Sequence, residues 1–190
     1  MATQPIQPLT EEEYLRIERA AFEKSEFHGG EMFAMAGGTP NHSLIGNRTT
    51  SLLDRLVPSS CRVFNSDQRI HMAAPGTFTY ADGLGVCGKP EFDSDQKDNL
   101  LNPLLIVEVL TPSTQDYDRG KKFELYRTIE SFREYLIVHQ DRRFVEHHSK
   151  QEDGSWVLRE YTGTSATVAI PRLDLQIPLL DLYGTALDLD

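Results

Sequence analysis

The sequence has few cysteines and no long apolar segment. Two cysteines occur, Cys61 and Cys87, and they form no CxxC pair. This count indicates neither a zinc cluster nor a disulfide framework. The longest strongly apolar run, 104–110, is interrupted by Glu108 and is too short to span a bilayer. The first ten residues contain no apolar signal-peptide segment. We therefore expect a cytoplasmic protein, in a reducing setting, without a membrane partner.

Basic residues are also scarce, because 19 Lys and Arg stand against 29 Asp and Glu, a net charge of −10. This balance excludes a generally basic nucleic-acid coat and disfavours an anionic membrane surface. A hydrophobic content of 39% is enough for a folded core. The length of 190 residues fits one domain of ordinary size. We predict a flexible N-terminal arm over residues 1–9 and a single domain over residues 10–190.

Three well-known catalytic motifs are missing. The sequence contains no G-x-x-x-x-G-K-[ST], G-x-S-x-G or H-E-x-x-H. These absences argue against a P-loop nucleotide hydrolase, a serine hydrolase of the nucleophile-elbow type and a zinc protease.

The order of the predicted elements indicates a sheet with helices on its faces. A capping box at Thr10 and Glu13 predicts a helix over 10–23, and Gly29-Gly30 predicts a hairpin within 25–35. An apolar stripe predicts a helix from residue 40 that ends before Pro58. The expected later elements are strands 62–72 and 77–86 joined as a hairpin, a loop over 88–102, a buried strand 103–110, a helix 118–129, strands 135–139, 144–148, 156–161, 167–170 and 173–177, and a helix 179–183. This order is typical of an α/β or α+β fold.

Two acidic residues lie where acids are uncommon. Glu108 lies within L-L-I-V-E-V-L, whose apolar neighbours predict burial on both faces of a sheet. A lone ionised carboxylate there would cost several kcal/mol, unless it is protonated, paired with a cation or bound to a metal. Asp82 interrupts the strand-like run T-F-T-Y-A-D-G-L-G-V. A solvent-facing Glu108 and an Asp82 that caps a glycine bulge remain the alternatives. Together the two acids indicate a paired-carboxylate site, which suits Mg²⁺.

Four further residues could join this pair. Glu31 follows the Gly-Gly turn, where glutamates are usually solvated. It is a candidate for the site only if the fold brings it beside Asp82. Asp118 and Lys122 are four residues apart and can meet on one helical face. A surface salt bridge is the common outcome for such a pair. Over the carboxylates, the Lys122 ammonium could instead orient an attacking water or stabilise phosphate charge. His42, at a helix start, and Asp118 are candidate accessory residues.

Several motifs in a fixed order resemble a known family. They are L-T-E-E-E-Y-L, G-G-E-M-F-A-M-A-G-G-T-P-N-H, T-Y-A-D-G, L-I-V-E-V-L-T-P-S-T, D-R-G-K-K-F-E-L-Y-R and R-E-Y-L-I-V. This series resembles the restriction-endonuclease-like family of uncharacterised bacterial proteins, placed in the PD-(D/E)xK nuclease superfamily. The resemblance covers residues from about 9 to 183.

The resemblance implies a mixed central sheet flanked by helices, a restriction-endonuclease-like core with additional C-terminal strands. It also implies a divalent-metal site that hydrolyses phosphodiester bonds. By motif position, Asp82 stands at the PD aspartate and Glu108 at the first acid of (D/E)xK. Glu31 stands at the N-terminal glutamate of the family, and Lys122 at its helix lysine. The catalytic residues are then these four, with Mg²⁺ or Mn²⁺ held by the three acids.

The sequence departs from the family pattern at four positions. Gly30 replaces the acid that usually precedes the N-terminal glutamate. Ala81 replaces the usual proline before the aspartate, and Gly83 replaces a β-branched residue after it. Leu110 stands two residues after Glu108, where a strict ExK has its lysine. We infer that Lys122 substitutes for that lysine from the following helix.

The leading hypothesis is a Mg²⁺-dependent endonuclease that cleaves nucleic acid, DNA in the first instance. Asp82 and Glu108 would hold the metal, and Lys122 would position the water. The alternative is a non-catalytic binding or assembly protein on a degenerate nuclease scaffold. A third interpretation is a metal-dependent hydrolase of small phosphorylated molecules. We also expect a homodimer, with Trp156, Val157, Leu158 and Tyr161 as candidates for its surface.

Overall fold

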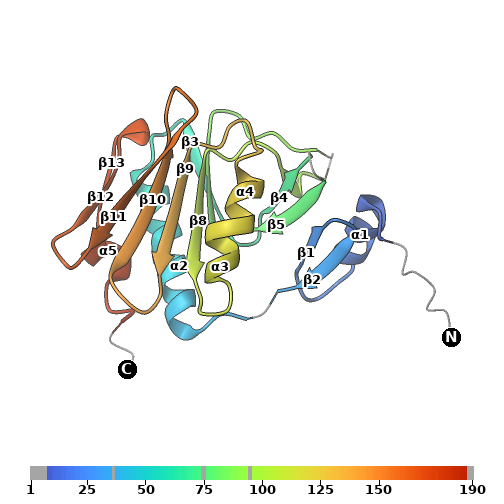
Figure 1. The fold of residues 1–190 in the computed structure, drawn as a ribbon, viewed down its shortest axis with the longest axis horizontal. Helices are drawn as coiled ribbons and strands as arrows, with labels where there is room; N and C mark the ends of the chain where they lie inside the picture. The colour runs from blue at the N-terminus through green and yellow to red at the C-terminus, as the bar shows by residue number, and fades with distance from the viewer. Residues whose placement is uncertain (1–7, 36, 74–75, 94–95, 188–190) are drawn as a thin grey trace.

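A six-stranded mixed sheet forms the centre of the computed structural model, which describes residues 8–35, 37–73, 76–93 and 96–187 (Figure 1). Its strand order is β11-β10-β9-β8-β6-β3, and only the β8–β9 pair among these neighbours is parallel. The strands are β3 (Cys61–Asn65), β6 (Gly83–Cys87), β8 (Leu105–Leu110), β9 (Glu134–His139), β10 (Phe144–Lys150) and β11 (Trp156–Thr162). The predicted mixed sheet flanked by helices is confirmed.

Helices cover both faces of this sheet. Successive side chains of β8 point to opposite faces, and each face forms an apolar core with a different helix. Leu105, Val107 and Val109 pack in the core that contains α2, while Ile106 and Leu110 pack in the core that contains α4. In Figure 1 these helices lie on opposite faces of the sheet. The first core also includes the C-terminal elements. The elements are α2 (Pro40–Leu56), α4 (Phe123–Tyr126), β12 (Thr167–Ile170), β13 (Leu175–Pro178) and α5 (Leu179–Tyr183).

A five-stranded sheet packs beside the central one, in the order β2-β1-β5-β4-β7. Its strands are β1 (Ser25–His28), β2 (Glu31–Ala34), β4 (Arg69–Met72), β5 (Thr77–Tyr80) and β7 (Asn99–Leu100). The helix α1 (Glu11–Glu18) covers this sheet. The Tyr14 ring of α1 lies 4.9 Å from Phe27 and 5.2 Å from Phe78, measured between ring centroids. The predicted hairpin turn is present, with Gly29 at φ +61° and Gly30 at φ +86°.

The helix after β8 differs from the regular helix expected over 118–129. It consists of α3 (Gln115–Tyr117), a π-helical turn η1 (Asp118–Lys122) and α4, which ends at Tyr126. Single π-helical turns widen a helix locally and occur often at functional sites. This turn carries both residues that the spacing argument paired, Asp118 and Lys122.

Each of the two expected long strands is divided between the two sheets. The segment 62–72 contains β3 and β4, separated by a turn in which Asp67 N donates to Asn65 Oδ1 at 3.0 Å. The segment 77–86 contains β5 and β6, and the chain changes sheet at Ala81 and Asp82. β4 and β5 do pair as a hairpin, with Met72 opposite Thr77, whereas Ala74 and Pro75 lie outside the described residues.

Smaller differences concern the ends of predicted elements. The first helix keeps the capping box at Thr10 but ends at Glu18, whose buried carboxylate accepts hydrogen bonds from Ser25. The expected loop 88–102 contains β7. Of the predicted arm, residues 1–7 lie outside the described part, and Leu9 N donates to Gly30 O at 2.9 Å. None of the described helices is both long and apolar enough to cross a membrane.

The proposed dimer surface lies at the edge of the central sheet. β11 is the last strand of that sheet, and its Val157 and Leu158 side chains are 36% and 46% exposed. The homodimer and the cytoplasmic location both stay predictions.

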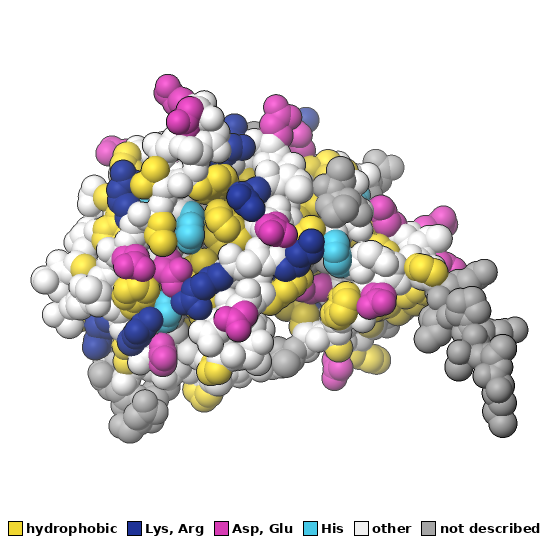
Figure 2. Space-filling model, viewed as in Figure 1, with side chains coloured by type: hydrophobic (Ala, Val, Ile, Leu, Met, Phe, Trp, Pro, Cys, Tyr) yellow, Lys and Arg dark blue, Asp and Glu magenta, His cyan; other side chains and the backbone are white. Residues whose placement is uncertain are grey.

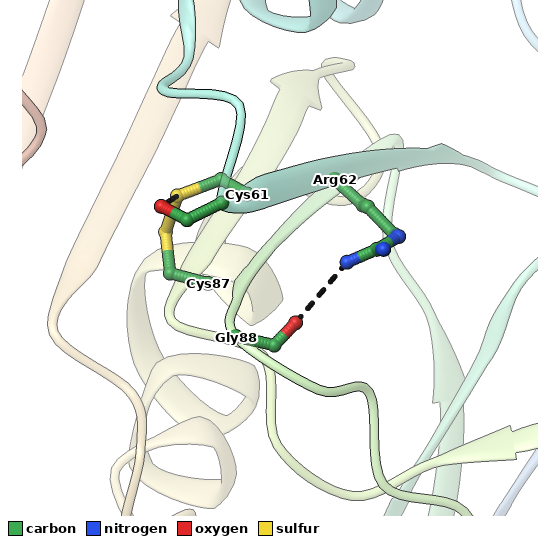
Figure 3. The surroundings of a disulfide bond; sticks show 5 residues. Cys61, Arg62, Cys87 and Gly88 are labelled. Carbon is green, nitrogen blue, oxygen red and sulfur yellow. Dashed lines mark hydrogen bonds between the residues drawn. A yellow bond between two sulfur atoms is a disulfide. The ribbon is translucent and has the colours of Figure 1, made fainter.

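The two cysteines form a disulfide, which their count did not indicate (Figure 3). Cys61 begins β3 and Cys87 ends β6, and the antiparallel register places them directly opposite, with Cα atoms 3.9 Å apart. The next residue, Arg62, donates to Gly88 O at 3.2 Å. The two cysteines are 26 positions apart in the sequence, and this spacing does not predict that they meet. They meet only because β3 and β6 pair in the observed register. The cysteine count therefore carries no argument for a reducing compartment.

Reduction of this disulfide should lower the free energy of unfolding by about 3 kcal/mol, because the bond closes a loop in the unfolded chain. Urea unfolding with and without reductant measures the difference. The double variant Cys61→Ser/Cys87→Ser is the control, and reductant should leave its stability unchanged. Free thiols that react in the denatured, unreduced protein would contradict the bond.

Candidate active site

A buried ion pair joins the strand acid and the helix lysine that the sequence singled out. Lys122 Nζ lies 2.9 Å from Glu108 Oε1, and the two residues are 5% and 4% exposed. Glu108 projects from β8 on the same face as Ile106 and Leu110, toward the helical segment. Tyr126 OH donates to Glu108 Oε1 at 2.6 Å, and Lys122 Nζ donates to the carbonyl of Tyr80 at 3.0 Å. The carboxylate and the ammonium therefore satisfy each other out of contact with bulk water.

Two more carboxylates surround the same ammonium. Glu26 Oε1 lies 3.3 Å and Asp118 Oδ1 lies 3.8 Å from Lys122 Nζ. Glu26 comes from β1 in the other sheet, where the Thr79 hydroxyl of β5 donates to it. The ammonium thus joins both sheets and the π-helical turn at one point.

Asp82 lies where the chain passes from the five-stranded sheet to the central one. Its Oδ2 accepts from Val109 N at 2.7 Å, so it is fixed beside the strand that carries Glu108. His42 Nε2 lies 3.4 Å from the same oxygen. His42 belongs to the first turn of α2, where Thr39 Oγ1 caps the helix by accepting from His42 N. This carboxylate is half-buried and is held from two sides.

A cavity of about 440 Å³ connects these groups. Its lining includes four acids, Glu26, Asp82, Glu108 and Asp118. Among the described residues that line it, Lys122 is the only lysine or arginine. Three of the predicted site residues, Asp82, Glu108 and Lys122, therefore share one concave site, with the accessory candidates His42 and Asp118.

Glu31 does not line this cavity, contrary to its expected place beside Asp82. It is exposed at the start of β2, opposite His28. Its side chain shares a face with Phe33 but lies two residues nearer the turn, about 7 Å along the strand. Glu26 stands at the site instead. The sequence gave little reason to select Glu26, because it is a single acid in the four-residue strand S-E-F-H.

Burial and neighbouring charges shift the proton affinities of the cluster. Burial raises the pKa of Glu108 well above its ordinary value, Asp118 and Asp82 add to the rise, and Lys122 opposes it. Burial raises the pKa of Asp118 as well, against the effect of Lys122. For Lys122, burial favours the neutral amine, but Glu108, Glu26 and Asp118 together hold its pKa well above the usual range. The lysine is therefore a lasting cation in this cavity.

The donor set can accept a divalent cation on two carboxylates. Among the described residues, no group of three or more His, Cys, Asp or Glu is arranged to hold a metal. Asp82 Oδ1 and Glu108 Oε2, however, accept no hydrogen bond from the described residues, and both residues line the cavity. Mg²⁺ prefers oxygen ligands and commonly takes only one or two protein carboxylates, with waters and substrate phosphate as the rest. The residues present fit such an ion.

The fold places the chain in a structural class. It matches the crystal structure of "a putative nuclease belonging to DUF820" from Anabaena variabilis with a TM-score of 0.76, over 94% of this chain and 99% of that one. The identity is 17%, so this likeness shows the fold. The class is an α+β fold with a mixed sheet between helices, shared with that protein.

The family follows from the sequence match. The Uma2 family model, described as "Putative restriction endonuclease", matches residues 11–180, and the chain belongs to this family. Two uncharacterized proteins of Synechocystis sp. are similar to it. One, sll1609, is 38% identical over 84% of this chain and 91% of its own length. The other, slr1290, is 36% identical over 83% and 82%.

Replacement of Lys122 by methionine should destabilise the protein by about 3–5 kcal/mol at neutral pH, because it leaves the buried Glu108 and Asp118 carboxylates, and the partly buried Glu26, without their cation. The loss should shrink in acid, where the Glu108 and Asp118 carboxyls, whose pKa values are raised, take up protons. Urea unfolding across pH measures both effects.

The matched control is Lys121→Met, one residue earlier, where the side chain is 53% exposed and lies 3.7 Å from Glu124. This exposed substitution should change stability by less than about 0.5 kcal/mol. Equal effects of the two variants would show that the buried cluster does not depend on its lysine.

Proposed function

We propose that this protein is a divalent-metal-dependent nuclease that hydrolyses phosphodiester bonds in nucleic acid, with DNA as its first expected substrate. The observation that carries the proposal is the contact of Lys122 with Glu108 in a cavity that Asp82 also lines. Two carboxylates and one ammonium in one concave site are the groups that phosphodiester hydrolysis with a metal needs. Membership of the restriction-endonuclease-like family supports the same reaction class.

Asp82 and Glu108 would hold Mg²⁺ or Mn²⁺ through the oxygens that accept no hydrogen bond from the described residues. A bound ion of this kind supplies positive charge at the scissile phosphate and makes a neighbouring water more acidic. The Val109 N–H bond to Asp82 Oδ2 keeps that carboxylate oriented toward the cavity. The Tyr126 hydroxyl does the same for Glu108.

Lys122 would act as a hydrogen-bond donor and a fixed positive charge. Its raised pKa keeps the amine protonated, so it can orient the attacking water or a phosphate oxygen but cannot accept the proton of the water. Glu26 holds the ammonium from the side of β1 and would take the role that the family resemblance implied for Glu31. Asp118 and His42 are supporting residues, placed against Lys122 and Asp82.

Two observations favour the alternative, a non-catalytic binding or assembly protein on this scaffold. No three-ligand metal group exists among the described residues, and the usual lysine position two after Glu108 holds Leu110. In a scaffold of this kind, the buried Glu108–Lys122 pair would have a structural role only. Metal binding and cleavage separate the two functions.

Cleavage of single- and double-stranded DNA and of RNA with Mg²⁺ or Mn²⁺ tests the proposal. Asp82→Asn and Lys122→Met should each lower the rate by about 100-fold or more, since each removes charge stabilisation from the reacting phosphate. Glu26→Gln and Glu31→Gln form a matched pair. The first should impair cleavage, and the second, at an exposed position outside the cavity, should not.

Calorimetry with Mg²⁺ and Mn²⁺ on the wild type and on Glu108→Gln completes the test. Binding that disappears in Glu108→Gln supports the metal site. Equal cleavage by the wild type and Asp82→Asn would exclude the proposed roles. A protein that neither binds metal nor cleaves any of these substrates would be the non-catalytic scaffold.

A further inference from the structure

Exposed apolar side chains gather at the mouth of the acidic cavity. The described residues include nine large hydrophobic side chains that are clearly exposed, and three of them line this one cavity. They are Phe33, Met35 and Tyr117, which are 49%, 37% and 38% exposed. Two of the three are aromatic. Large apolar groups left open beside a polar site mark a surface that contacts a ligand.

The register of the β1–β2 hairpin explains why Phe33 lies at the site. Phe33 pairs directly with Glu26, so their side chains project from the same face. Phe27 and Met32 form the neighbouring pair on the other face, where they pack around Tyr14. Phe33 is therefore free of the core and adjacent to the acid that contacts Lys122. Tyr117 approaches the same acid from the helical segment, with its hydroxyl 3.5 Å from Glu26 Oε2.

Cations that could track a duplex backbone are few around the cavity. Lys122 is the only lysine or arginine in its described lining, and it is held by acids. An adjoining cavity of about 570 Å³ shares Asp82 and His42 and is lined by Lys24. That amine is also held, 2.6 Å from Asp67 Oδ1. On the face shown in Figure 2, basic side chains alternate with acidic ones and form no continuous basic surface. Duplex binding usually depends on many phosphate contacts.

We infer that the site accepts an unpaired nucleotide, whose base stacks on Phe33 and Tyr117 while its phosphate faces Asp82, Glu108 and Lys122. This inference rests on the proposed nuclease function and narrows its substrate to single-stranded DNA, including single-stranded ends. Stacking on aromatic side chains holds unpaired bases without regard to sequence and does not need a basic surface. A paired base presents only its edge and cannot stack in this way.

The test compares a short single-stranded DNA with the blunt duplex of the same sequence, each carrying 2-aminopurine, whose fluorescence reports stacking. Binding is measured with Ca²⁺, and cleavage with Mg²⁺. The wild type should bind and cleave the single strand better than the duplex, and binding should change the 2-aminopurine fluorescence. Phe33→Ala and Tyr117→Ala should each weaken single-strand binding by about fivefold or more.

Phe22→Ala is the matched control, because Phe22 is a fully exposed phenylalanine that does not line the cavity. It should leave binding and fluorescence unchanged, and Phe33→Tyr, which keeps a ring, should restore both. A duplex that is bound and cleaved as well as the single strand would overturn this inference and leave the nuclease function standing. Equal single-strand binding by Phe33→Ala and the wild type would also overturn it. Absence of cleavage and of binding on both DNAs and on RNA would instead refute the proposed function itself.

Discussion

The buried contact between Glu108 and Lys122 is the interaction on which the arrangement of the site depends. It joins β8 of the central sheet to the π-helical turn, while the same ammonium reaches Glu26 of the other sheet and the Tyr80 carbonyl at the end of β5. Burial of a charged pair costs desolvation energy that its attraction only partly offsets, and apolar residues of similar volume often do as well. A network with three acids around one lysine is therefore a poor device for stability alone. The proposed role of this network in hydrolysis would explain why it is present.

The junction between the two sheets explains a departure from the family pattern. Asp82 needs the chain to change sheet directly after β5, and the next residue, Gly83, lies against α2. A Cβ atom at Gly83 would lie 2.7 Å from Thr50 Cγ2 of α2, so any larger residue here would force a neighbouring group to shift. The same helix carries His42, which contacts Asp82 from its first turn. Glycine at this position thus allows α2 to pack closely against the start of β6.

The sequence predicted site residues where a charged residue lies among apolar ones. It did not predict features that depend on how distant strands pair. Glu108 in an apolar strand indicated a carboxyl that is protonated, paired with a cation or bound to a metal, and the structure pairs it with Lys122. Helical spacing indicated that Asp118 and Lys122 can meet, and they lie 3.8 Å apart. The division of two expected strands between two sheets was not visible, because both halves of each have the same apolar composition. The Cys61–Cys87 bond depends on the β3–β6 register, and the choice between Glu26 and Glu31 depends on how the hairpin is seated, so neither follows from local pattern.

The β1–β2 hairpin shows how so small an element can serve the fold and the site together. The two-residue period of a strand gives Phe27 to the core around Tyr14 and gives Glu26, one position earlier, to Lys122. The opposite strand repeats the division, with Met32 packed on the core and Phe33 exposed at the cavity. Because the two sets of side chains lie on opposite faces, changes at Phe33 leave the packing around Tyr14 intact. The proposed stacking of a base therefore depends on one face of the hairpin, while the other face holds the five-stranded sheet to α1.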